Sequence, residues 1–159
     1  MSHSLLLPNR YKKIGWCLFI PMFVAGLLVF ATNYEANWLQ GKVFTICSGF
    51  FGDKNAPRKW FIETNLTNTL LGILFITGAL LVGFSKEKNE DEYIARLRLN
   101  ALLWAVLVNY ILLLIAFILV YDLPFFTVMT FNMFTVLLLF IFRFHYLLYR
   151  SKIALTDEK

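Results

Sequence analysis

Charged residues are scarce in this sequence. They make up 16% of its 159 residues, whereas 59% are hydrophobic, and the mean hydropathy is +0.66. A soluble domain of this length would need more polar surface to cover one core, and it could not hide 17 phenylalanines inside that core. The 15 lysines and arginines form no clustered soluble patch, which argues against nucleic-acid binding. The composition predicts a membrane protein.

Groups that carry chemistry are equally scarce. The sequence contains no CxxC motif, and its two cysteines, Cys17 and Cys47, are expected on opposite sides of the membrane, where they cannot pair. The two histidines, His3 and His145, lie outside the long apolar runs, which disfavours haem ligation inside a bundle and catalytic zinc. None of the ten acids lies within an apolar run, and no nucleophile has an adjacent base. We therefore expect no catalytic residue, no metal site and no cofactor, in a protein that is not an enzyme.

What the sequence does contain is four apolar runs, each close to the roughly 20 residues that a helix needs to cross a hydrocarbon core of about 30 Å. The runs cover residues 14–32, 66–84, 99–121 and 124–142. Lipid offers the backbone no hydrogen-bond partner, and the runs lack the period-two alternation of barrel strands, so all four are predicted to be helices. The predicted fold is an all-α bundle of four transmembrane helices, in a single membrane domain over residues 1–159.

Lysines and arginines are divided unevenly between the two sides of these spans. If the N-terminus is inside, 11 of the 15 lie on the inner side, in the N-terminal segment, the loop 85–98 and the tail 143–159. The other four lie in the loop 33–65. By the positive-inside rule, we expect a multi-pass protein of the cell membrane, with both termini cytoplasmic and the 33–65 loop external.

Local signals indicate where the helices begin and end. Asn89 followed by Glu92 has the form of a capping box, so the third helix is expected to start before its membrane span. Asp122 and Pro124 are typical of a first helical turn, which predicts a tight hairpin between spans three and four. Pro21 should kink the first helix. Residues beyond 150 are expected to form a frayed tail.

One stretch of the external loop is unusually apolar. Residues 42–51 are too few to span a bilayer and too apolar to lie in water. We expect an interfacial or re-entrant segment, with its phenylalanines at the level of the lipid headgroups.

Three amide side chains and one hydroxyl inside the spans form a candidate polar intramembrane site, whose members are Asn68, Asn109, Asn132 and Thr135. They accompany small residues at helical spacing, namely Gly72, Ala79 and Gly83 on span two and Ala101, Ala105 and Ala116 on span three. In lipid, such faces let helices approach closely and hydrogen-bond to one another. A tight hairpin brings Asn109 within one turn of Asn132 and Thr135. These groups form either a ligand site or interhelical contacts, and the lack of an ionisable group beside them favours contacts.

The inner ends of spans three and four form a second candidate surface. The third helix is expected to project roughly two to three turns into the cytoplasm, stabilised by a Glu92–Arg96 pair at i, i+4. Candidate contacts to a cytoplasmic partner or to lipid are Tyr93, Ile94, Leu97, Arg143 and His145. The alternatives are a solvated helix extension and an Arg143 that only snorkels.

Several short stretches carry a resemblance to known proteins. Residues 90–99 (EDEYIARLRL), Trp104-Ala105, Asn109-Tyr110, residues 132–135 (NMFT) and Arg143-Phe144 together resemble a pattern in small four-span bacterial membrane proteins of unassigned function. The resemblance covers the second half of the chain. Some of those proteins are encoded beside a helix-turn-helix regulator, so the resemblance implies a membrane partner in regulation.

Polar packing faces without catalytic groups favour a non-enzymatic accessory, sensory or regulatory membrane protein that acts through protein–protein contacts. Its expected partners are membrane lipids and either another protein or a second copy of the chain, but not nucleic acid. The alternative is a small transporter, or a protein that binds a lipid or small molecule at the mid-membrane amides. That alternative requires a hydrated or lipid-filled cavity at their depth.

Overall fold

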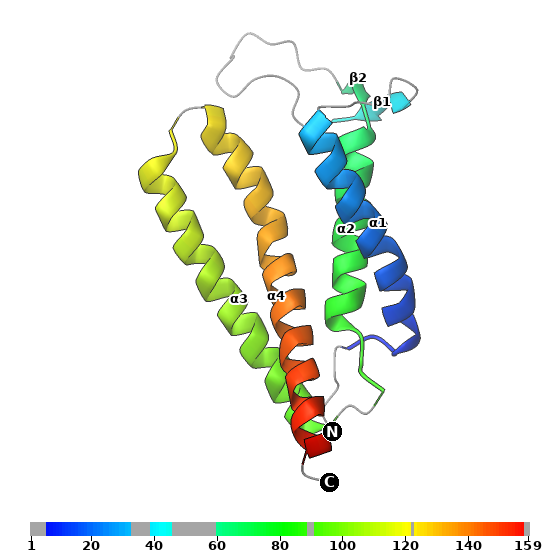
Figure 1. Ribbon diagram of the computed structural model, residues 1–159. Helices are drawn as coiled ribbons and strands as arrows, with labels where there is room; N and C mark the ends of the chain where they lie inside the picture. Colours follow the sequence, from blue (N-terminus) through cyan, green and yellow to red (C-terminus); the bar gives the residue numbers. More distant parts are fainter. Residues whose placement is uncertain (1–5, 33–38, 46–59, 89–90, 122, 158–159) are drawn as a thin grey trace. The chain divides into compact units, whose positions relative to one another are not determined.

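The computed structural model describes residues 6–32, 39–45, 60–88, 91–121 and 123–157, most of which form four long helices (Figure 1). They are α1 (Arg10–Thr32), α2 (Thr67–Phe84), α3 (Glu92–Leu119) and α4 (Leu123–Asp157). All four are long and apolar enough to cross a membrane. The predicted all-α fold with four membrane-spanning helices is confirmed, and the chain is a multi-pass helical membrane protein.

The chain divides into two compact units. Unit 1 comprises Met1–Phe19 and Ile76–Lys159, and unit 2 comprises Ile20–Phe75. Unit 1 therefore holds the first half of α1, the second half of α2, and all of α3 and α4. Unit 2 holds the remaining parts of α1 and α2 and the segment that joins them. The single membrane domain over residues 1–159 stays a prediction.

Within unit 1, α1 and α2 approach each other to backbone contact. A Cβ atom on Gly15 would lie 2.8 Å from the backbone nitrogen of Val82, and one on Gly78 would lie 2.8 Å from that of Phe19. Side-chain carbons do not pack this closely against backbone atoms, so only glycine fits at both positions. Ala79, the next residue along α2, is fully buried. Close packing of small residues is the main source of helix association in lipid, and it joins α1 to α2 here.

A second close contact joins α2 to α4. A Cβ atom on Gly83 would lie 2.6 Å from Cε1 of Phe140, so the phenylalanine ring fills the space above the glycine. Phe140 is almost completely buried, and its ring contacts those of Phe84 and Phe144, with centroids 5.7 and 6.2 Å away. The apolar window of α2 is 33% buried, against 11% for each of the other three helices. α2 is therefore the helix that both α1 and α4 contact.

α3 and α4 form an antiparallel pair in unit 1 (Figure 1). The side of α3 that is buried includes Ala101 and Ala105, both at 0% exposure, and Asn109 at 2%. These three residues belong to the stripe of small and polar residues predicted from the sequence, so that prediction is confirmed. Ala116, in the same predicted stripe, is only half-buried.

The start of α3 differs from the prediction. The N-cap is Asp91 rather than Asn89, which lies outside the described residues. Asp91 has an extended backbone, and its carboxylate accepts a hydrogen bond from the Ile94 N–H at 2.9 Å, as an N-cap does. The carboxylate of Glu92 pairs with Arg96 at 2.8 Å, and the predicted capping box with Asn89 lies outside the described residues. That i, i+4 pair was predicted and is confirmed.

α4 is longer than predicted. It begins at Leu123, with Pro124 in its first turn, and continues to Asp157. The tail expected over residues 143–159, with its frayed end, is therefore helical as far as Asp157. No glycine or second proline follows Pro124, so nothing in the sequence stops the helix at the membrane edge. Its 35 residues measure about 52 Å, well beyond a hydrocarbon core of about 30 Å. The predicted cap Asp122 lies outside the described residues.

Unit 2 contains a β-hairpin where an interfacial segment was expected. Strands β1 (Gln40–Phe44) and β2 (Phe61–Asn65) pair antiparallel, from Gln40 opposite Asn65 to Phe44 opposite Phe61. Only the first residues of the predicted 42–51 segment belong to β1, and residues 46–51 lie outside the described part. The ring of Phe44 stacks on that of Trp60 at 6.0 Å, and both side chains are exposed. Exposed aromatics are typical of a membrane interface, and that location stays a prediction.

The glycine contacts between α1 and α2 can be tested by adding one methyl group. Gly15→Ala or Gly78→Ala should each lower the free energy of unfolding by about 1–3 kcal/mol, because the new Cβ would push two backbones apart. Gly26→Ala is the matched control on α1, since its Cβ would meet nothing within 4 Å. It should leave stability unchanged or raise it by about 0.5–1 kcal/mol through the better helix propensity of alanine. Unfolding in detergent measures all three, and equal effects would contradict the close approach.

Candidate functional site

Nine lysines and arginines gather at one end of unit 1, which we call the basic end. Its described residues are 6–16, 85–88, 91–98 and 143–151. The same ranges contain three acids, Glu87, Asp91 and Glu92. These ranges flank the points where the apolar runs of the helices stop, which is the depth of lipid headgroups in a bilayer. The basic end thus presents a positive charge at the depth expected for lipid headgroups.

The chain ahead of α1 is fastened to the end of α2 at this site. The Leu7 N–H donates to the Phe84 carbonyl at 2.9 Å, and the Lys86 N–H donates to the Leu7 carbonyl at 2.8 Å. The Asn9 amide nitrogen adds a third bond, to the Lys86 carbonyl at 2.6 Å. We call residues 7–9 with residues 84–86 the N-terminal clasp. It satisfies the carbonyl of Phe84, the last residue of α2, which the helix leaves without a partner, and the carbonyl of Lys86 just beyond it.

Arg98 is buried beside the clasp, although it carries a charge. It is 7% exposed, donates from Nη2 to the Ser85 carbonyl at 3.2 Å, and lies 5.0 Å from the ring centroid of Phe144. These contacts tie α3 to the end of α2 and to α4 through hydrogen-bonding and cation–π attraction. The sequence interpretation counted Arg98 only as one of the cytoplasmic cations. A signal was present, because Arg98 shares the helical spacing of Ala101, Ala105 and Asn109 on α3.

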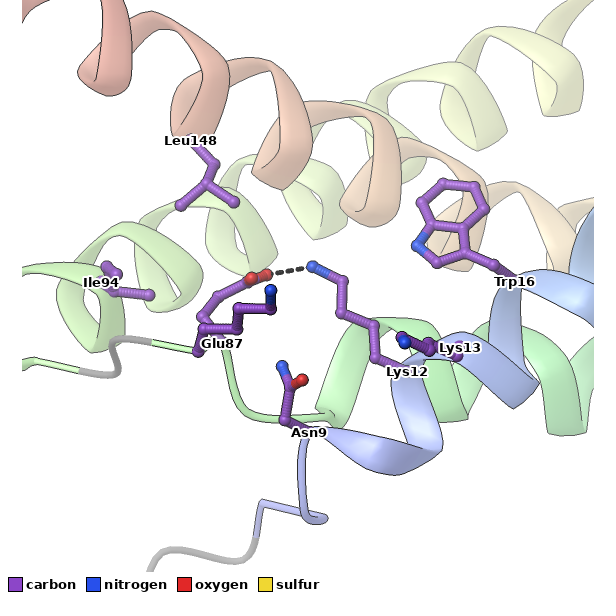
Figure 2. Close-up of a pocket in the computed structure, with 8 residues that line it drawn as sticks. Asn9, Lys12, Lys13, Trp16, Glu87, Ile94 and Leu148 are labelled. Carbon is purple, nitrogen blue, oxygen red and sulfur yellow. Dashed lines mark hydrogen bonds and ion pairs between the residues drawn. The ribbon is translucent and has the colours of Figure 1, made fainter. Parts of the chain in front are cut away.

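A hollow of about 470 Å³ opens between the elements of the basic end. Figure 2 shows Lys12 of α1 and Glu87 of the α2–α3 connection pointing toward one another across it, where they form an ion pair. Both side chains are largely shielded from solvent, at 16% and 13% exposure. The other lining residues are Asn9, Lys13, Trp16, Lys88, Ile94 and Leu148. Three lysines and one glutamate thus face this hollow, which the sequence interpretation did not predict as a unit.

Two members of the predicted intramembrane site meet as expected. The amide of Asn109 on α3 donates to Asn132 Oδ1 at 3.3 Å, and the amide of Asn132 on α4 donates to Asn109 Oδ1 at 3.2 Å. Each amide therefore satisfies the other, and Asn109 is almost fully buried. This reciprocal pair is an interhelical contact between α3 and α4.

The other two members of that predicted site differ in their surroundings. Thr135 donates its hydroxyl to the Phe131 carbonyl one turn earlier in α4, at 3.0 Å. This bond within its own helix occupies the hydroxyl, as is common for threonine in apolar helices. Asn68 is exposed in the first turn of α2, in unit 2.

The predicted partner or lipid contacts differ in exposure. Tyr93 is 57% exposed, whereas Leu97 is half-buried and Ile94 lines the hollow. Arg143 lies over the ring of Trp104 at 4.9 Å, on the neighbouring helix. His145 donates from Nδ1 to the Ile141 carbonyl at 2.9 Å, since a carbonyl can only accept. Of the five, Tyr93 is the residue that presents most of its side chain outward.

A stripe of exposed apolar side chains runs along the far half of α4. Its members are Phe142, Tyr146, Tyr149 and Ile153, at 70%, 55%, 66% and 43% exposure. Their spacing of four, three and four residues places them on one helix face. We call this set the α4 stripe. The sequence interpretation placed a candidate surface at the inner end of span four, but it did not group these four side chains, because it ended the span at residue 142.

Comparisons with known proteins assign no family to the chain. No family model matches it, and neither curated proteins nor solved structures provide a significant match. In the part of the chain that the structure describes, no three His, Cys, Asp or Glu side chains are grouped so as to hold a metal ion.

The asparagine pair can be tested with a double-mutant cycle. Asn109→Ala and Asn132→Ala should each destabilise the fold, with a coupling free energy of about 0.6 kcal/mol, the average for interhelical hydrogen bonds in membranes. Asn100→Ala replaces Asn109→Ala in the control cycle, because Asn100 is exposed on the same helix. That cycle should show no coupling. Additive effects of Asn109→Ala and Asn132→Ala would contradict a direct bond.

Proposed function

We propose that this chain is a non-enzymatic accessory, sensory or regulatory membrane protein that acts through protein–protein contacts at its basic end. The observation that carries the proposal is the α4 stripe. A helix that starts at Leu123 has used the roughly 20 residues needed to cross the hydrocarbon core by about Arg143. Tyr146, Tyr149 and Ile153 therefore lie beyond the lipid tails.

Tyrosine is common at headgroup depth, whereas the exposed Ile153, one turn beyond Tyr149, lacks a lipid tail to contact. A continuous helix face with anchors at i, i+3 and i+7 is the form in which one helix recognises another protein through a groove. Tyrosine suits such a surface because it buries a large ring and keeps its hydroxyl hydrogen-bonded. Tyr93, exposed in the first turn of α3 at the same basic end, extends the candidate surface.

The charge distribution supports a cytoplasmic location for the basic end. Eleven of the 15 lysines and arginines lie on the side of the two termini. The positive-inside rule supports a cytoplasmic basic end in the cell membrane. A cytoplasmic partner also agrees with the resemblance to small bacterial four-span proteins, some of which accompany a regulator. The alternative, transport or ligand binding at mid-membrane, is less favoured because Asn109 and Asn132 satisfy each other.

Site-specific photo-crosslinking in native membranes tests the proposal. A photoreactive phenylalanine analogue at Tyr149 or Tyr146 should give a discrete crosslinked protein species, either with another protein or with a second copy of the chain. The matched control is Leu114, which is 61% exposed but lies at mid-span on α3. It should crosslink to lipid alone.

A second arm asks whether the species depends on the stripe. With the crosslinker at Tyr146, an added Tyr149→Ala substitution should reduce the yield at least several-fold, because tyrosine anchors contribute strongly to interfaces. No discrete species from either tyrosine, or the same species from Leu114, would contradict the proposal.

A further inference from the structure

We propose that the hollow at the basic end is a binding site for a phosphate-bearing anion, such as the headgroup of an anionic phospholipid. This site goes beyond the proposed protein–protein function and does not depend on it. Three properties of the hollow carry the inference: its depth, its charge and its walls.

The lining residues lie where phosphate groups lie in a bilayer. Lys12 and Lys13 come directly before the apolar run of α1, which starts at Ile14, and Trp16 follows it by less than a turn. Glu87 and Lys88 come a few residues after α2 ends at Phe84. Tryptophan marks the interface between headgroups and tails, and lysines next to it sit at the headgroup level. The hollow therefore opens at the depth of lipid phosphates.

The charges in the hollow leave two lysines for an anion. Lys12 and Glu87 neutralise each other in their shielded ion pair. Lys13 and Lys88 line the same hollow, are exposed, and form no ion pair with any acid that the structure describes. Two ammonium groups that line one hollow, one on α1 and one on the α2–α3 connection, suit a phosphate, which offers several acceptor oxygens. Basic pockets between transmembrane helices are known to bind lipid headgroups in this way.

Apart from Asn9, the remaining residues that line the hollow are apolar or aromatic. Trp16, Ile94 and Leu148 come from α1, α3 and α4, so three helices contribute to one surface beside the lysines. Such a wall suits the glycerol and first carbons of a lipid better than it suits a free inorganic ion. The volume of about 470 Å³ falls within the range of about 300–1,000 Å³ typical of small-molecule sites.

The test measures binding to the purified full-length chain in a neutral detergent, where no membrane surface potential exists. Native mass spectrometry counts bound molecules of dioleoyl phosphatidylglycerol and of dioleoyl phosphatidylcholine, whose choline cancels the phosphate charge. We expect phosphatidylglycerol to bind at least about ten-fold more tightly. A parallel arm adds inorganic phosphate up to millimolar concentrations. Displacement of the lipid by phosphate alone would identify a soluble phosphate as a second source of the ligand.

Three variants make the test specific to the hollow. Lys13→Gln with Lys88→Gln should weaken phosphatidylglycerol binding about ten-fold or more. Arg10→Gln with Arg150→Gln removes the same charge from exposed positions of the basic end that do not line the hollow, and should weaken it less than about three-fold. Glu87→Gln should strengthen binding, because it removes the one acid and frees Lys12.

The outcomes separate clearly. Equal losses in the two double variants, equal binding of the two lipids, or weaker binding after Glu87→Gln would each overturn the site. A circular-dichroism melting curve for each variant establishes that the chain is folded when binding is measured. Photo-crosslinking from the α4 stripe does not involve Lys13 or Lys88, so a failure of the proposed function leaves this result unaffected, and the reverse also holds.

Discussion

The arrangement of unit 1 depends on the small-residue surface of α2. Gly78 and Ala79 let the backbone of α1 approach until no side-chain carbon fits between them, and Gly83 accepts the ring of Phe140 from α4. Inside the bilayer the hydrophobic effect no longer favours contact between helices, because lipid tails are as apolar as the side chains. Helix association must therefore come from close packing and hydrogen bonds. α2 provides the packing toward two helices at once. α3 then joins the group through α4, by way of its buried alanines and the Asn109–Asn132 pair.

The basic end follows from this packing. Once α1 and α2 are in contact, the chain before α1 lies beside the end of α2, and the N-terminal clasp forms between residues 7–9 and 84–86. The clasp brings Lys12 to Glu87 and creates the hollow beside them. Arg98 of α3 lies beside the clasp, where its guanidinium group donates a hydrogen bond to the Ser85 carbonyl and contacts the Phe144 ring. Features far apart in the sequence therefore meet because two glycines allow two helices to touch.

The sequence predicts part of this arrangement and not the rest, for physical reasons. Span positions follow from hydropathy, and the Asn109–Asn132 pair follows from a tight hairpin, because both depend on neighbouring stretches of chain. The Gly15–Val82 contact joins two different helices, and the sequence around a glycine does not indicate which helix packs against it. The clasp joins residues 77 positions apart in the sequence, so no local sequence pattern predicts it. α4 continues beyond the predicted span because the hydropathy pattern indicates only which residues contact lipid. The helix itself continues until a helix-breaking residue occurs.

The central claim, backbone-close packing of α1 on α2, is tested most directly by a disulfide between them. A Cβ atom on Gly78 would lie 3.1 Å from the Cβ of Leu18, close to the separation of about 3.5–4.5 Å in disulfides. With Cys17 and Cys47 replaced by serine, a chain carrying Leu18→Cys and Gly78→Cys should form an intramolecular disulfide in membranes under mild oxidation. Gly26→Cys paired with Gly78→Cys should not. Two thiols that stay free in the first chain, or a disulfide that links two chains, would contradict the account.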